Sequence, residues 1–116
     1  MKTWYLKFMG HTIGELLYYP ESDEYCLDVS RPDMFKGRLE KCFLNNEMCR
    51  RWMLSRLTPE YQGGYREKII RWGLNPDDPA HRIQLFFLSK AGNMRDGMWI
   101  ADNEKDDTDK APFYGM

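Results

Sequence analysis

The chain has 116 residues, a length that suits one domain, because separate hydrophobic cores need roughly 100 residues each. Apolar residues make up 42% of it and aromatic residues 15%, which fills one packed core and argues against a disordered chain. The net charge of −1 argues against a dedicated nucleic-acid protein, but the charge is unevenly spread. Residues 1–30 sum to −3, residues 31–96 to +5 and residues 97–116 to −3. A basic middle between acidic ends can attract an anionic partner.

The first nineteen residues are apolar but are interrupted by charges such as Lys7 and Glu15, unlike a signal peptide or membrane helix. We therefore expect a cytoplasmic protein without a membrane partner. The cysteines form no CxxC pair, and their odd number cannot close into a complete disulfide framework: Cys26, Cys42 and Cys49. With only two histidines in the chain, no conventional zinc ligand set is present. We expect three reduced thiols, no metal and no cofactor.

The N-terminal part reads as antiparallel strands. Apolar residues 3–9 and 12–19 flank a Gly-His pair, and glycine in the first loop position is typical of a type II′ hairpin turn. This register places Leu17 on the core face, together with Glu15. Residues 25–29 alternate and add a third strand, which completes a meander.

Helical patterns fill the middle of the chain. Ser30, followed by a proline and an acid, predicts a helix over residues 30–43 with an apolar stripe from Phe35 onwards. A second helix over residues 47–57 follows an Asn-Asn cap. A third helical segment begins with Thr-Pro-Glu at residue 58, carries a Gly-Gly break and ends before Gly73.

The C-terminal part returns to strands. Over residues 82–88, Ile83 and Leu85 alternate with Arg82 and Gln84, which predicts a strand that pairs with residues 98–101 as a hairpin. Its second face is also apolar towards the end, so the strand is expected to be covered on both sides. Residues 102–116 are acidic and are expected to form a flexible tail, with residues 1–101 as a single domain. A second interpretation has the tail dock on a partner or on the domain's own basic helices. The fold class is α+β: a mainly antiparallel sheet, built from the meander and the C-terminal hairpin, with two or three helices on one face.

The strongest candidate site is a basic helical surface close in sequence to several aromatic residues, which predicts contact with an anionic partner. Ordinary solvation of an amphipathic helix accounts for the same pattern, and packing accounts for the aromatic residues. The predicted partner-binding residues are Arg50, Arg51, Arg56, Arg66, Lys68 and Arg71.

Catalysis has weaker sequence support. A thiol enzyme needs a cysteine beside a histidine, and all three cysteines fall in apolar periodic segments, which predicts burial. No catalytic or metal-binding residue is therefore assigned. We expect a small non-enzymatic binding protein with a protein partner. The alternatives are nucleic-acid binding through the same basic surface and, third, an unrecognised enzyme. The sequence leaves the oligomeric state open.

Overall fold

The structure is a computed structural model that describes residues 1–37, 39, 41–57, 65–75, 77–88, 90 and 97–105, without the side chains of Tyr65, Arg66, Lys68 and Pro79. The predicted helix start at residues 58–60, the loop at residues 91–96 and the tail beyond residue 105 lie outside the described residues. The elements in chain order are β1 (Lys2–Phe8), β2 (His11–Tyr19), β3 (Glu24–Val29), β4 (Phe43–Leu44), α1 (Asn46–Ser55), α2 (Tyr65–Arg71), α3 (Pro79–Leu88) and β5 (Met98–Ala101).

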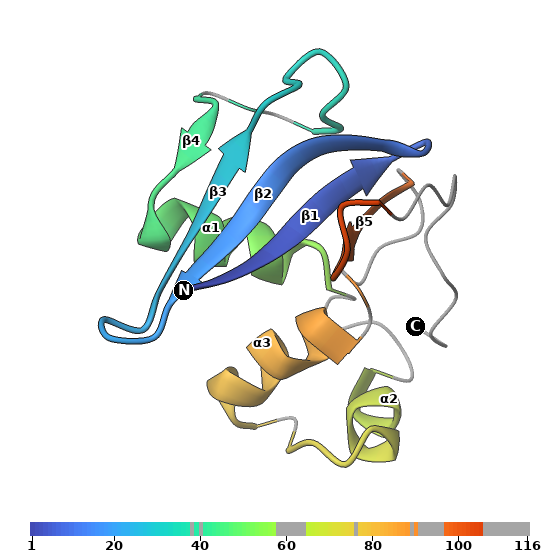
Figure 1. Cartoon of the computed structure of the whole chain (residues 1–116). Coiled ribbons are helices and arrows are strands. Elements are labelled where there is room, and N and C mark those ends of the chain that lie inside the picture. Colours follow the sequence, from blue (N-terminus) through green and yellow to red (C-terminus); the bar gives the residue numbers. More distant parts are fainter. Residues whose placement is uncertain are drawn as a thin grey trace.

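The strands form one antiparallel five-stranded sheet in the order β4-β3-β2-β1-β5 (Figure 1). The predicted α+β class and the N-terminal meander are confirmed. The predicted C-terminal hairpin is wrong, because β5 pairs with β1. The last described strand therefore forms one edge of the sheet beside the first strand. This pairing brings residues nearly one hundred positions apart into contact. The boundary between domain and tail at residue 101 stays a prediction.

The hairpin between β1 and β2 turns one residue earlier than expected. Met9 and Gly10 both have positive φ angles, of 49° and 80°, which is the pattern of a type I′ turn rather than the predicted type II′ turn. Both turn types follow the right-handed twist of the flanking strands. The hairpin itself is confirmed, and its turn type is corrected.

A β-bulge shifts the register within this hairpin. Leu6 pairs with Gly14 but Lys7 pairs with Thr12, so Ile13 is the extra residue of β2. Beyond the bulge, Leu16 is fully buried in the core, where the sequence placed Leu17. A one-residue shift moves every following side chain to the other face of the sheet. The predicted placement of Glu15 on the core face is therefore wrong, and its side chain is exposed.

The segment after β3 is not the predicted helix. It makes a single turn, in which the amide of Phe35 donates to the carbonyl of Pro32 over 3.3 Å. Gly37 has a φ of 114°, a left-handed conformation that a helix cannot continue through. The amide of Val29 then donates to the carbonyl of Cys42, which starts the pairing of β3 with β4. The prediction that Phe35 faces the core is confirmed, but this residue lies in a loop.

Residues 79–88 form the helix α3, so the strand predicted over residues 82–88 is wrong. Asp78 caps it, since one carboxylate oxygen accepts from the amide of Ala80 over 2.9 Å. Pro79 occupies the first helical position, which suits its fixed φ angle. Leu85 and Phe86 are fully buried, and Arg82 lies half-buried three and four residues before them. This spacing is helical, and the apparent alternation covers only four residues.

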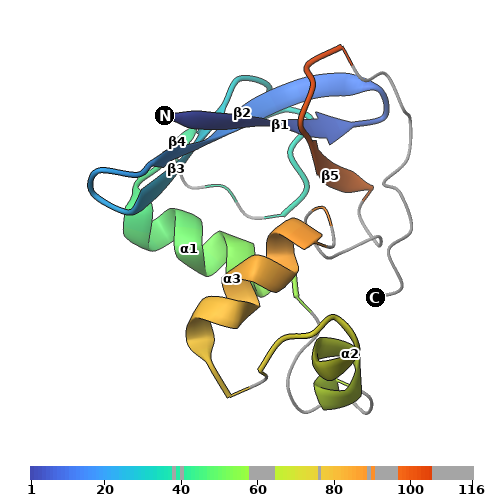
Figure 2. The same ribbon diagram turned by 60° about the horizontal axis from the view of Figure 1, so that its bottom comes forward.

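Two helices cover one face of the sheet. Seen nearly edge-on, the sheet has α1 and α3 on the same side (Figure 2). The predicted helix over residues 47–57 is confirmed as α1, with Asn45 as its cap and Cys49 and Met53 fully buried. Aromatic contacts join the layers, since the Trp4 ring on β1 lies 4.4 Å from that of Phe87 on α3, and they join the two helices, since the Trp52 ring lies 5.7 Å from that of Phe86. No helix of the described residues covers the opposite face of the sheet, which is called the helix-free face below.

Candidate functional site

Arg50, on the first turns of α1, is held by local contacts. Its Nε donates to Asn46 over 3.0 Å, and its Nη2 donates to the Asp23 carbonyl over 2.6 Å. The guanidinium also lies 4.9 Å from the centre of the Tyr25 ring. Tyr18 donates to the Asp23 carboxylate, and this hydrogen bond raises the pKa of the tyrosine. Arg50 therefore ties α1 to the β2–β3 turn.

Arg51 and Arg56 lie in opposite environments. Arg51 is exposed and forms an ion pair of 2.6 Å with Glu47, one helical turn earlier. Arg56 is only 4% exposed, and its Nη2 donates to the Met98 carbonyl on β5 over 2.9 Å. Its guanidinium lies 5.7 Å from the centre of the Trp52 ring. The prediction that Arg56 belongs to an exposed basic surface is wrong.

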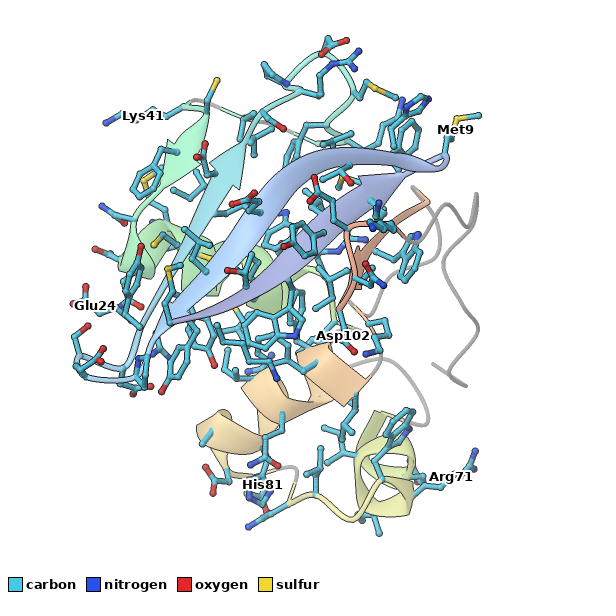
Figure 3. All side chains as sticks on the ribbon, viewed as in Figure 1. Met9, Glu24, Lys41, Arg71, His81 and Asp102 are labelled. Atoms are coloured by element: carbon cyan, nitrogen blue, oxygen red, sulfur yellow. The ribbon has the colours of Figure 1, made fainter. Side chains whose placement is uncertain are left out.

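The remaining predicted contact residues lie on α2. Arg71 is exposed and points away from the molecule (Figure 3), whereas the side chains of Arg66 and Lys68 lie outside the described residues. Figures 1 and 2 both place α3 between α1 and α2. Arg51 and Arg71 are thus on separate parts of the molecule. The described residues do not assemble the continuous basic face that a nucleic-acid backbone needs.

A groove lies along α1, and the sequence did not predict it. It has a volume of about 300 Å³, at the lower end of the range of ligand pockets. One wall comes from the loop after β3 and from β4, and the other from a single stripe of α1. We call this feature the α1 groove, lined by Phe35, Leu39, Leu44, Met48, Arg51, Trp52 and Ser55.

The described lining of the α1 groove is mostly apolar, and its two polar residues, Arg51 and Ser55, come from α1. Phe35 and Leu44 are buried in its wall, and the rings of Phe35 and Trp52 lie 6.2 Å apart. Among the described residues, Arg51 is the one charged side chain of the lining. Its ion pair with Glu47 engages Nη2, one of the three nitrogens of a guanidinium with five N–H donors. The arrangement combines apolar pockets with one cation that fits a carboxylate.

Helical spacing explains the composition of this wall. Met48, Arg51, Trp52 and Ser55 stand at positions i, i+3, i+4 and i+7, so they share one stripe of α1. The neighbouring stripe, with Cys49 and Met53, faces the sheet. The sequence showed that Met48 and Trp52 are apolar stripe positions. It did not show that the loop before β4 stops short of covering them.

The thiols gain no catalytic support from their surroundings. Burial raises the pKa of the Cys49 thiol to about 12 and also raises that of Cys26. Both therefore carry a proton at neutral pH, in agreement with their predicted burial. Cys42 is exposed, against expectation, because residues 30–42 are not a helix. Within the described residues, no three His, Cys, Asp or Glu side chains come together as metal ligands.

Comparisons with protein-family models, with curated proteins and with solved structures find no match for this chain. None of the helices in the described part of the chain is long and apolar enough to cross a bilayer.

Proposed function

We propose that this chain is a non-enzymatic, cytoplasmic binding protein that takes a short segment of a partner protein into the α1 groove. The segment carries apolar anchor side chains next to an acidic residue. The observation that carries this proposal is the apolar lining with one cation, Arg51, at its rim. Three free thiols support the location, since this redox state is typical of reducing compartments.

The length of the α1 groove favours an extended peptide segment. The lining stripe runs from Met48 to Ser55, which at 1.5 Å per residue spans roughly 10 Å. An extended peptide covers this distance with about three residues, at about 3.3 Å each. Two apolar side chains then enter the groove, and a following carboxylate reaches Arg51. The charge makes the contact selective, while the apolar contacts supply most of the affinity.

The test uses two matched arginine variants and fluorescein-labelled peptides in which Leu and Phe precede Asp or Glu. Fluorescence anisotropy should show binding to the acidic set, and about tenfold weaker binding when Lys replaces the acids. Arg51→Glu should weaken binding at least tenfold, whereas Arg71→Glu should leave it within twofold. Both substitutions make the same charge change at an exposed residue, but only Arg51 lines the groove.

Two outcomes contradict the proposal. One is that neither peptide set binds. The other is that Arg51→Glu and Arg71→Glu weaken binding equally, which would mean that the peptide contacts arginines spread over the surface and not the α1 groove. A single-stranded oligonucleotide at low salt serves as the third probe. If it binds the protein and Arg71→Glu reduces that binding, nucleic-acid recognition replaces the groove as the better account.

A further inference from the structure

A row of three polar side chains crosses β2, β1 and β5 on the helix-free face of the sheet. Lys7 pairs with Thr12 on one side and with Trp99 on the other, and directly paired residues share a face. Met98 and Ile100, the neighbours of Trp99 along β5, belong to the hydrophobic core on the opposite face. The row is therefore separate from the α1 groove, which lies on the helix side.

Lys7 is buried without an anionic partner among the described residues. It is 1% exposed, and its Nζ donates to the Thr12 hydroxyl over 2.7 Å and to the Glu104 carbonyl over 2.5 Å. Both acceptors are neutral. No carboxylate of the described residues lies within ion-pair distance of this ammonium group. A buried charge without a counter-ion is costly, so the arrangement calls for an anion.

Trp99 supplies a second donor beside the lysine. It is 3% exposed, yet its Nε1 has no hydrogen-bond partner among the described residues. Buried indole N–H groups usually have an acceptor. Thr12 adds a third donor, because its oxygen accepts from Lys7 and its hydroxyl hydrogen can be donated elsewhere. The row thus presents donors from three strands and no anionic acceptor.

We propose that Lys7, Thr12 and Trp99 form a binding site for a carboxylate. The single negative charge of a carboxylate matches the single ammonium, and its two oxygens can accept from donors on neighbouring strands about 5 Å apart. The carboxylate has two sources. One is a separate molecule. The other is the chain itself, because Asp106, Asp107 and Asp109 follow Glu104 within five positions in the sequence.

The test follows the indole N–H signals of the full chain by two-dimensional ¹H–¹⁵N NMR, with Trp99→Phe to assign the Trp99 signal. Sodium acetate is the probe, and sodium chloride at equal concentration is the control. A separate-molecule site predicts a saturable shift of the Trp99 signal with acetate in the wild-type chain. An internal carboxylate predicts that D106N/D107N/D109N moves this signal before acetate is added, and that acetate then moves it back.

Matched variants test whether Lys7, Thr12 and Trp99 cause the response of the Trp99 signal. Lys7→Met and Thr12→Val should each abolish the response, and the threonine variant covers the case in which the lysine variant does not fold. Lys2→Met, an exposed lysine on the same strand, should retain it. The proposal is overturned if neither acetate nor the triple substitution moves the Trp99 signal more than the other indole signals. A response that persists in both Lys7→Met and Thr12→Val would overturn it equally.

Discussion

Arg51 and Arg56 lie five residues apart, yet one is exposed beside the α1 groove and the other is buried against β5. The sequence held a signal for this difference. Arg56 stands seven residues after Cys49 and three after Met53, which places it on the core-facing stripe. Its planar guanidinium tolerates burial because it stacks on Trp52 and donates to a carbonyl. The residue type alone predicts an exposed arginine, whereas the helical spacing correctly predicts that Arg56 faces the core.

Lys7 had no comparable signal. It alternates with Leu6 and Phe8, as a solvent-facing residue of a half-buried strand would. Its burial arises from tertiary structure, because β5 and the Glu104 carbonyl arrive from the far end of the chain. Single-sequence periodicity cannot report such a contact.

The buried thiol of Cys49 makes the free energy of unfolding depend on pH in the alkaline range. Its pKa is raised to about 12 in the folded state, from an ordinary value of 9.0. Below the ordinary pKa both states hold the proton, and the full stability is present. Between these values the unfolded chain loses the proton first, so the free energy of unfolding falls by up to about 1.4 kcal/mol per pH unit.

Urea unfolding of wild type and Cys49→Ala between pH 8 and 11 measures this effect. We expect the alanine variant to be less stable at pH 8, since it leaves a small cavity, and the gap to narrow as pH rises. Cys42→Ala, at an exposed cysteine, should keep the wild-type slope. If the free energy of unfolding falls with pH equally in the wild type and in Cys49→Ala, the Cys49 thiol does not contribute to the pH dependence.

Elements with a cap and a sustained period were predictable, as in α1, where Asn45 precedes a stripe of two full turns. The errors arose where two signals conflicted. Over residues 82–88 the short alternation predicts a strand, but Asp78-Pro79, an acid before a proline, is a strong helix start, and the structure has a helix here. Over residues 30–43 the start signal at Ser30 predicts a helix, but the backbone conformation of Gly37 ends any helix at that point. The cap therefore determines the helix at residues 79–88, and the glycine prevents one at residues 30–43.

The cap of α3 gives a test at this scale. Asp78→Ala removes the acceptor for the Ala80 amide, so we expect the free energy of unfolding to fall by about 1 kcal/mol. Asp102→Ala is the control, because its exposed ion pair with Lys90 should contribute less than about 0.5 kcal/mol. Urea unfolding at pH 7 compares the two. Equal losses would mean that Asp78 does not act as a cap.

At the scale of the whole molecule, fold class was easier to predict than the site. Alternating strands and a helical middle suffice for an α+β sheet with helices on one face. The α1 groove, in contrast, requires the loop around Phe35 to pass beside α1 and leave Trp52 partly uncovered. That geometry depends on the pairing of β4 with β3. Of the predicted contact residues, Arg51 lines the groove, Arg50 and Arg56 make internal contacts, and Arg71 lies elsewhere.

The most direct measurement of the proposed function maps where an acidic–apolar peptide binds. In ¹H–¹⁵N and methyl NMR spectra of the full chain, the peptide should shift the Trp52 indole and the Met48 methyl signals saturably, while Arg71 and its neighbours stay unchanged. The Trp99 indole, on the opposite face, distinguishes this site from the proposed carboxylate site. Shifts centred on α2, or none at Trp52 and Met48, would contradict binding in the α1 groove.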